Sequence, residues 1–128
     1  MEHTVHNRPH IASASVSEAS SDAEAFQNKT LRPIIKMLHN LLLLHFSNLL
    51  ASKRNLYFKL SVKDKSDYIA KIFETDTAYK RELRGIVLGH FTLSELNSYS
   101  AVKVEADRRI NKIVLERLLS SQDQMVKR

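Results

Sequence analysis

The stretch that decides the fold is Leu31-Arg-Pro-Ile-Ile-Lys-Met-Leu-His-Asn-Leu-Leu-Leu-Leu-His-Phe-Ser-Asn-Leu-Leu50. Its apolar residues recur at spacings of three and four, the period of one face of an α-helix. Pro33 must either start or kink this helix, because proline has no N–H and its ring clashes with the preceding turn. The stretch predicts a short helical lead-in over residues 22–30, followed by a main helix that ends at Ser52.

Local start signals place further helices after this one. Ser61 followed by Asp64 predicts an N-cap and a helix over 61–74, and a second helix over 76–89 follows. Thr92 and Glu95 form a capping box that predicts a last helix from Leu93 to about Gln122. The buried stripe predicted for this last helix consists of Leu96, Tyr99, Val102 or Lys103, Ala106, Ile110, Ile113, Val114 and Leu118.

Composition favours the same fold class. The chain has 128 residues with only two glycines and two prolines, and β-sandwiches and barrels need more of both at their turns. The sequence therefore predicts a single all-α domain over residues 22–122, with four to five helices in a helical bundle or a helix-turn-helix-like array. A disordered acidic leader, residues 1–21, is predicted before it, and a frayed basic C-terminus, residues 123–128, after it.

Several classes of chemistry are excluded by residue types and spacing. The chain has no cysteine, which removes disulfides, thiolate zinc sites, iron–sulfur clusters and thiol nucleophiles. The sequence contains neither a glycine-rich phosphate-binding loop nor the Gly-x-Ser-x-Gly motif that carries the nucleophile of many hydrolases. His39 and His45 are six residues apart, so they point about 240° apart around a helix and share no metal from one face. We expect no catalytic residue, no cofactor and no metal site.

The sequence also carries expectations about location. No secretory signal is visible at the N-terminus, and the most apolar run, residues 38–50, is shorter than the roughly 20 residues of a membrane-spanning helix. A cytoplasmic protein without a membrane span is expected.

Positive charge is concentrated in two parts of the chain. Residues 31–60 carry five basic and no acidic side chains, and the last helix adds a second basic group. This pattern permits binding to a phosphate backbone. Against DNA reading, the helix after Thr92 begins with an acid where base-contacting side chains belong. The candidate nucleic-acid-binding residues are Lys53, Arg54, Lys59, Arg108, Arg109, Lys112 and Arg117.

Self-association is predicted from the surplus of apolar residues on the main helix. A bundle of this size needs one apolar stripe per helix, and a second flank must be covered by something else. The predicted self-association residues are Leu42, Leu43, Phe46 and Leu50. Gly85 and Gly89, spaced as Gly-x-x-x-Gly, indicate close helix packing; the alternative is a small-ligand niche or a face for self-association.

Three segments resemble a family of small, uncharacterised all-helical bacterial proteins: Phe26–Ile35, Tyr57–Ser61 and Leu83–Thr92. The resemblance extends to Leu119, about three quarters of the chain, and implies one helical domain. It transfers no functional residue. Some members carry a glyoxalase label, which implies β-strands and a metal site with His and Glu ligands. This sequence predicts neither.

Together these observations predict a non-enzymatic helical protein-interaction or regulatory module that forms a homodimer. The alternative is a DNA- or RNA-binding regulator that uses a basic helical face.

Overall fold

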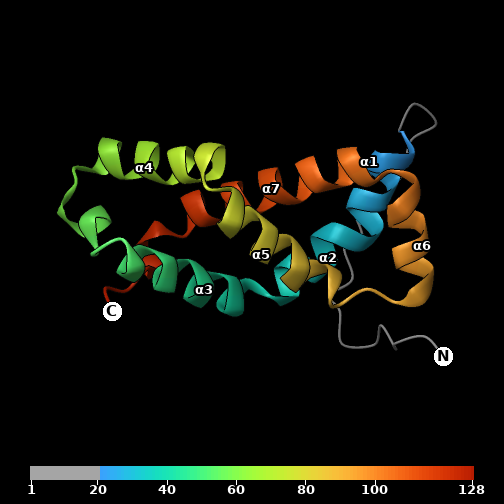
Figure 1. Cartoon of the computed structure of the whole chain (residues 1–128), viewed down its shortest axis with the longest axis horizontal. Coiled ribbons are helices and arrows are strands. Elements are labelled where there is room, and N and C mark those ends of the chain that lie inside the picture. The colour runs from blue at the N-terminus through green and yellow to red at the C-terminus, as the bar shows by residue number, and fades with distance from the viewer. Residues whose placement is uncertain (1–20) are drawn as a thin grey trace.

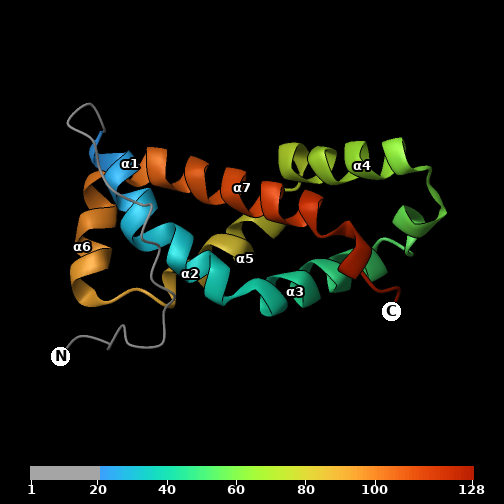
Figure 2. The same ribbon diagram turned by 180° about the vertical axis from the view of Figure 1, so that it is seen from behind.

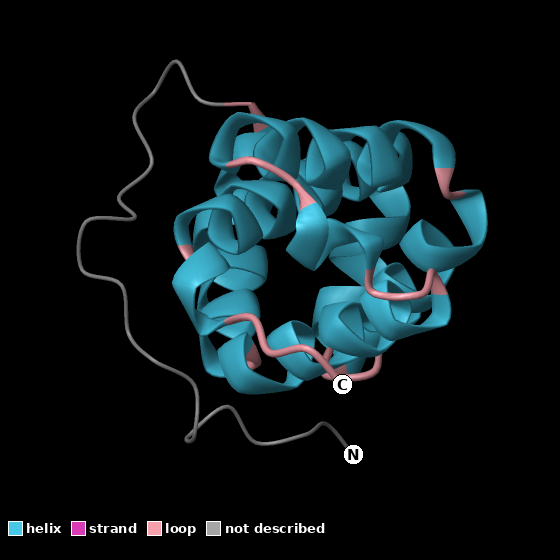
Figure 3. Cartoon of the chain, turned by 90° about the vertical axis from the view of Figure 1, so that its left-hand side faces the viewer, coloured by secondary structure: helices cyan, strands magenta, loops and turns pink. Residues whose placement is uncertain are grey.

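A computed structural model describes residues 21–128. This part of the chain consists of helices and short connections, without strands, which confirms the all-α prediction (Figures 1, 2 and 3). Its elements are α1 (Asp22–Phe26), a π-helical turn η1 (Gln27–Leu31), α2 (Arg32–Met37), α3 (His39–Ser52), a 3₁₀ turn η2 (Leu56–Lys59), α4 (Val62–Thr75), α5 (Thr77–Leu88), α6 (Leu93–Ala101), α7 (Lys103–Ser120) and a 3₁₀ turn η3 (Gln122–Gln124).

The first described helix, α1, begins at Asp22. The Oγ of Ser21 accepts a hydrogen bond from the backbone N–H of Glu24 at 3.1 Å, so Ser21 is the N-cap of α1. Residues 1–20 of the predicted leader lie outside the described residues.

Pro33 neither opens a helix after a loop nor bends the chain sharply. It is the second residue of α2 and follows the π-helical turn directly. In that turn the N–H of Arg32 bonds to the carbonyl of Gln27, five residues back. The wider turn makes room for a proline that would crowd the carbonyl four residues before it in an α-helix.

The sharp bend lies at Leu38 instead, so the predicted continuous main helix to Ser52 is wrong. The segments Asp22–Met37 and His39–Ser52 meet at 68°, with Leu38 at φ −89° and ψ 11°. Leu38 is buried, and its neighbour His39 contacts the C-terminal part of the chain. Tertiary packing sets this bend, because the sequence has neither glycine nor a second proline there.

The predicted last helix is likewise two helices, α6 and α7, separated at Val102. The hydroxyl of Tyr99 donates to the carboxylate of Asp107 at 2.5 Å. In a straight helix these residues lie about 12 Å apart along the axis, and the break at Val102 lies between them. Leu96, predicted to be buried, is 43% exposed, Val102 is half-buried and Lys103 is exposed, whereas Tyr99 and the stripe from Ala106 to Leu118 are buried.

The local start signals are confirmed. Ser61 caps α4 through the N–H of Asp64 at 3.2 Å. Thr92 and Glu95 exchange hydrogen bonds of 3.0 and 2.8 Å, the full capping box of α6. Asp76 caps α5 through the N–H of Tyr79 at 2.9 Å.

The Asp76 cap predicts an acid-sensitive stability. The hydrogen bond from the Tyr79 N–H, and Lys53 at 3.3 Å, hold the pKa of this carboxyl below its ordinary value. A group whose pKa is lower in the folded state stabilises the fold above the unfolded pKa, and this contribution is lost as the pH falls through the folded pKa. We expect the free energy of unfolding to fall below about pH 4.

Urea unfolding from neutral to acidic pH measures this effect, with Asp76→Asn as the matched control. Asparagine keeps the capping oxygen but has no carboxyl to titrate. The variant is expected to lose less stability than the wild type over the same pH range. Parallel pH profiles for the two proteins would show that Asp76 does not titrate differently in the folded and unfolded states.

The core is organised around α7, which contacts η1 and helices α1, α2, α4, α5 and α6. It runs along most of the long axis of the molecule, and α3 lies at the edge beyond α5 and α7 (Figures 1 and 2). An aromatic group of Phe46, Phe73 and Tyr79 joins α3, α4 and α5, with ring centroids 5.3–6.4 Å apart. The most apolar helix is therefore peripheral, which leaves part of it exposed.

The C-terminal residues have contacts that the sequence does not predict. Met125 is buried, and the side-chain amide of Asn55 donates to the carbonyl of Arg128 at 3.0 Å. The hydroxyl of Tyr57 donates to Gln122 at 2.9 Å. Residues 122–128 thus pack against the connection between α3 and α4.

Candidate functional site

The candidate nucleic-acid-binding residues do not form one face. Lys53, Arg54 and Lys59 lie near the end of α3 and in η2, whereas Arg108, Arg109 and Lys112 lie in α7, which begins at the opposite end of the molecule (Figures 1 and 2). Lys53 is paired with Asp76 at 3.3 Å. Six of the seven predicted basic residues thus form two separate groups.

Arg117 belongs to neither group, because its guanidinium is turned towards α3. Its Nη1 lies 3.2 Å from Nδ1 of His39. Arginine only donates, so Nδ1 accepts and the ring proton is on Nε2, which donates to Gln124 at 2.9 Å. This chain of contacts fixes α7 and the C-terminal turn to the first residue of α3 and gives Arg117 a structural role.

Three of the predicted basic residues do converge, on a polar pocket of about 420 Å³ between α7 and the α1–η1–α2 segment. Only one apolar side chain, Ile113, is among the residues that line it. The charged and polar lining residues are Glu24, Gln27, Arg32, Glu105, Arg108, Arg109, Lys112 and Glu116. We call this cavity the charged pocket.

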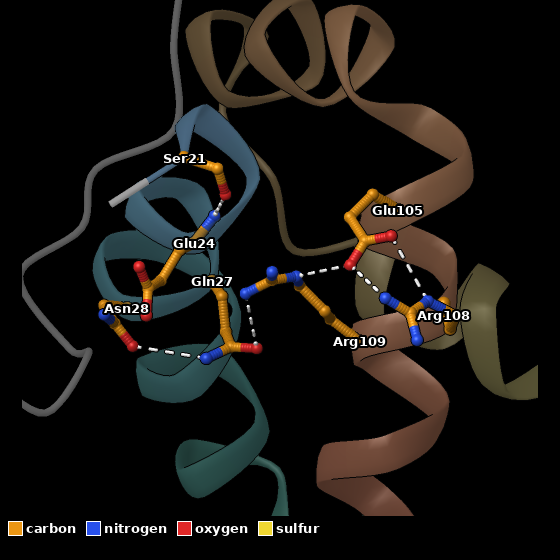
Figure 4. Close-up of polar contacts among 7 residues, drawn as sticks. All are labelled: Ser21, Glu24, Gln27, Asn28, Glu105, Arg108 and Arg109. Atoms are coloured by element: carbon orange, nitrogen blue, oxygen red, sulfur yellow. Dashed lines mark hydrogen bonds and ion pairs between the residues drawn. The ribbon is translucent and has the colours of Figure 1, made fainter. Parts of the chain in front are cut away.

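Glu105 orients two of the cations in the charged pocket (Figure 4). Its carboxylate accepts from Nε and Nη2 of Arg108 at 3.2 and 2.5 Å, and from Nε of Arg109 at 3.0 Å. Hydrogen bonds from Arg108 first, and then from Arg109, lower the pKa of Glu105. The carboxylate stays ionised and holds both guanidinium groups in fixed directions.

Arg109 also reaches across the pocket to the π-helical turn. Its Nη1 donates to the side-chain oxygen of Gln27 at 3.3 Å, while the Gln27 amide donates to Asn28 at 3.4 Å (Figure 4). The Arg109 side chain is 23% exposed, so it is partly buried yet keeps N–H groups for other acceptors. Arg109 is therefore the preorganised cation of this site.

The four predicted self-association residues lie in the core of the single chain. Leu42, Leu43, Phe46 and Leu50 are 0–8% exposed. On the same helix, Leu41 and Leu44 are each 47% exposed and point outwards. Leu41 and Leu44, in place of the four predicted residues, are therefore the candidate self-association residues of α3.

Gly85 is an exposed residue of α5, the helix that His45 of α3 contacts. His45 of α3 bonds through Nε2 to Glu82 of α5 at 2.9 Å, and the two helices run in roughly opposite directions (Figure 1). Leu41 is one turn before His45 and Gly85 one turn after Glu82, so they occupy neighbouring turns of the two helices. We call Leu41, Leu44 and Gly85 the α3–α5 face.

The glycine of this face is not used inside the single chain. A Cβ placed on Gly85 meets nothing within 4 Å, so the Gly-x-x-x-Gly spacing does not serve close packing of α5 against another described helix. Gly89, in contrast, is the C-cap of α5, with φ −62°. A glycine within a helix costs about 1 kcal/mol relative to alanine, and Gly85 brings no packing gain in return.

The described residues contain no group of three or more His, Asp or Glu side chains that could hold a metal ion. No single helix in residues 21–128 is long and apolar enough to cross a membrane. In the same residues, one pair of consecutive helical segments, Asp22–Met37 and His39–Ser52, together has the length and apolar composition of a membrane span. The two segments are bent by 68° relative to each other.

No family model, curated protein or solved structure matches this chain. The resemblance to small helical bacterial proteins therefore stays a prediction.

The sequence alone identifies only three of the nine residues that line the charged pocket, and only Gly85 of the α3–α5 face. Arg32 belongs to the basic segment 31–60, but only the fold brings it to Arg109 and Lys112. Gln27 has no motif that points to Arg109, 82 residues away in the chain. For the α3–α5 face, the spacing of Gly85 was the available signal, and its position relative to Leu41 depends on how α3 and α5 cross.

Proposed function

We propose that the protein is a non-enzymatic helical interaction module that forms a homodimer through the α3–α5 face. The observation that carries the proposal is an open glycine on α5 and two half-exposed leucines on α3, two helices that the His45–Glu82 contact joins. The leucines protrude and the glycine is a recess, because it has no side chain.

A second copy is the occupant that fits this combination. In a twofold dimer each subunit presents the same patch, so one patch must contain both the protruding and the receiving group. Leu41 or Leu44 of one subunit then packs against the bare backbone at Gly85 of the other. Burying exposed leucines removes apolar area from water, at roughly 25 cal/mol per Å².

Light scattering and sedimentation at tens of micromolar test the proposal. The wild-type chain is expected to have the mass of a dimer, and the double variant Leu41→Asp, Leu44→Asp the mass of a monomer. The matched control is Leu93→Asp, Leu96→Asp, which makes the same change at exposed leucines of α6. The control is expected to remain dimeric.

Gly85→Ala separates association from folding. Alanine fits without a clash in the single chain, so the free energy of unfolding of the monomer is expected to rise by about 0.5–1 kcal/mol. Dimerisation should weaken, since the methyl group fills the recess. A strictly monomeric wild type, equal dissociation of both leucine double variants, or Gly85→Ala without effect on association would each overturn the proposal.

A further inference from the structure

The charged pocket has a composition that selects its ligand. Almost all of its lining is ionic or amide, so a ligand gains little there from the burial of apolar surface. Binding must come from charge-assisted hydrogen bonds, which are stronger than neutral ones. Uncharged and mainly apolar compounds are excluded.

The order of the charged residues along α7 further restricts the class of ligand that fits the charged pocket. Glu105, Arg108, Arg109, Lys112 and Glu116 follow one another over about three turns, roughly 16 Å of helix. Three cations thus lie between two carboxylates. On the facing wall, α1 contributes another carboxylate, Glu24, and Arg32 follows eight residues later.

Some of the charged side chains that line the pocket are already paired with each other. Glu105 is committed to Arg108 and Arg109 by three hydrogen bonds. The described residues offer no ion pair to Arg32, Lys112, Glu24 or Glu116, and Arg109 retains unused N–H groups. The free lining therefore contains both donors for an oxyanion and carboxylates for an ammonium group.

We propose that the charged pocket binds a small zwitterion of the amino-acid type. Its carboxylate is held by Arg109, Arg32 and Lys112, and its ammonium group by Glu116, one turn beyond Lys112 on α7. A polyanion such as nucleic acid fits worse, because the free carboxylates repel a second and third phosphate. The site is independent of the α3–α5 face, which lies on other helices.

Two-dimensional NMR of the full chain tests the ligand class with three probes. Glutarate and L-glutamate have the same two carboxylates, and only glutamate carries an ammonium group. Cadaverine has two ammonium groups and no carboxylate. Glutamate is expected to shift amide signals of α7 and η1 and to bind about fivefold or more tightly than glutarate. Cadaverine should leave these signals unchanged.

Three conservative variants connect the shifts to the pocket. Lys112→Gln is expected to weaken glutamate and glutarate alike by about fivefold, and Glu116→Gln to weaken glutamate alone. The control, Lys63→Gln, removes the same charge from an exposed position of α4 and should change neither affinity. These substitutions lie on the surface, so folding is checked by the unshifted remainder of the spectrum.

Each other outcome overturns the inference. Equal affinity for glutarate and glutamate would make the pocket a simple oxyanion site. Cadaverine binding at the same residues would make it a cation site. An equal loss with Lys63→Gln would mean that net charge alone attracts the probe, and the absence of localised shifts with glutamate would mean that the pocket binds no such ligand.

Discussion

Replacing Leu42 by alanine is expected to lower the free energy of unfolding by about 3–5 kcal/mol, whereas Leu41→Ala is expected to cost less than about 1 kcal/mol. The two residues are adjacent on α3 and chemically identical, but Leu42 is 2% exposed and Leu41 47%. Truncating the buried leucine removes apolar contacts and leaves a cavity, while the outer one loses area that is largely in water.

Urea unfolding at two protein concentrations measures both effects and separates them from association. The loss for Leu42→Ala should not depend on concentration, because its contacts are within one chain. The smaller loss for Leu41→Ala should grow with concentration, since a dimer gains stability by mass action. If Leu42→Ala behaved as the concentration-dependent variant, Leu42 would lie at a subunit interface, as the sequence alone predicts.

The reason for the misplaced surface is that helical periodicity does not distinguish a core from an interface. Leu42, Leu43, Phe46 and Leu50 were interpreted as surplus because a four-helix bundle needs one stripe per helix. In the structure α3 contacts α4 and α5 through Phe46 and α7 through His39, and all four predicted self-association residues are buried. The surplus that remains is Leu41 and Leu44.

What the sequence predicts correctly is mostly local. A cap needs a side-chain acceptor and an N–H three residues later, so Ser61 and Thr92 are recognisable without knowledge of the fold. The breaks at Leu38 and Val102 are not recognisable in this way. Neither position has a glycine or proline, and both breaks accompany contacts between distant parts of the chain, such as His39 with Gln124.

For the basic residues, too, the sequence shows the local features but not the contacts between distant parts of the chain. Their number and sequence clustering are visible, and three of the seven candidates do line the charged pocket. Their partners are not visible: Arg117 contacts His39, 78 residues away, and Lys53 contacts the cap of α5. Counting positive charge therefore overestimates the charge available to a phosphate backbone.

Asp107→Ala is expected to lower the free energy of unfolding by about 2–4 kcal/mol, the largest effect we expect from a polar substitution. The carboxylate accepts from the Tyr99 hydroxyl at 2.5 Å and from Lys103 at 2.9 Å, and it lies 3.5 Å from Arg84. It connects α5, α6 and α7 at the break at Val102. Lys103 is exposed and contributes little, so most of the loss belongs to Tyr99 and Arg84.

Asp107→Asn is the matched control, because its amide oxygen still accepts from Tyr99 but carries no charge. It is expected to lose about half as much stability. In a double-mutant cycle, Tyr99→Phe should add little once Asp107 is alanine. Burial and then the hydrogen bond to Asp107 raise the pKa of Tyr99, so the hydroxyl remains a donor at neutral pH.

Hydrogen exchange shows where the loss is located. Tyr99 is the one residue of α6 that is buried, so without Asp107 the amides of α6 should exchange faster while those of α4 do not change. A cost below about 0.5 kcal/mol for Asp107→Ala would place this pair among ordinary surface contacts. The break at Val102 would then need another cause, and the burial of Tyr99 against Phe26 and Phe91 is the remaining contact that could set it.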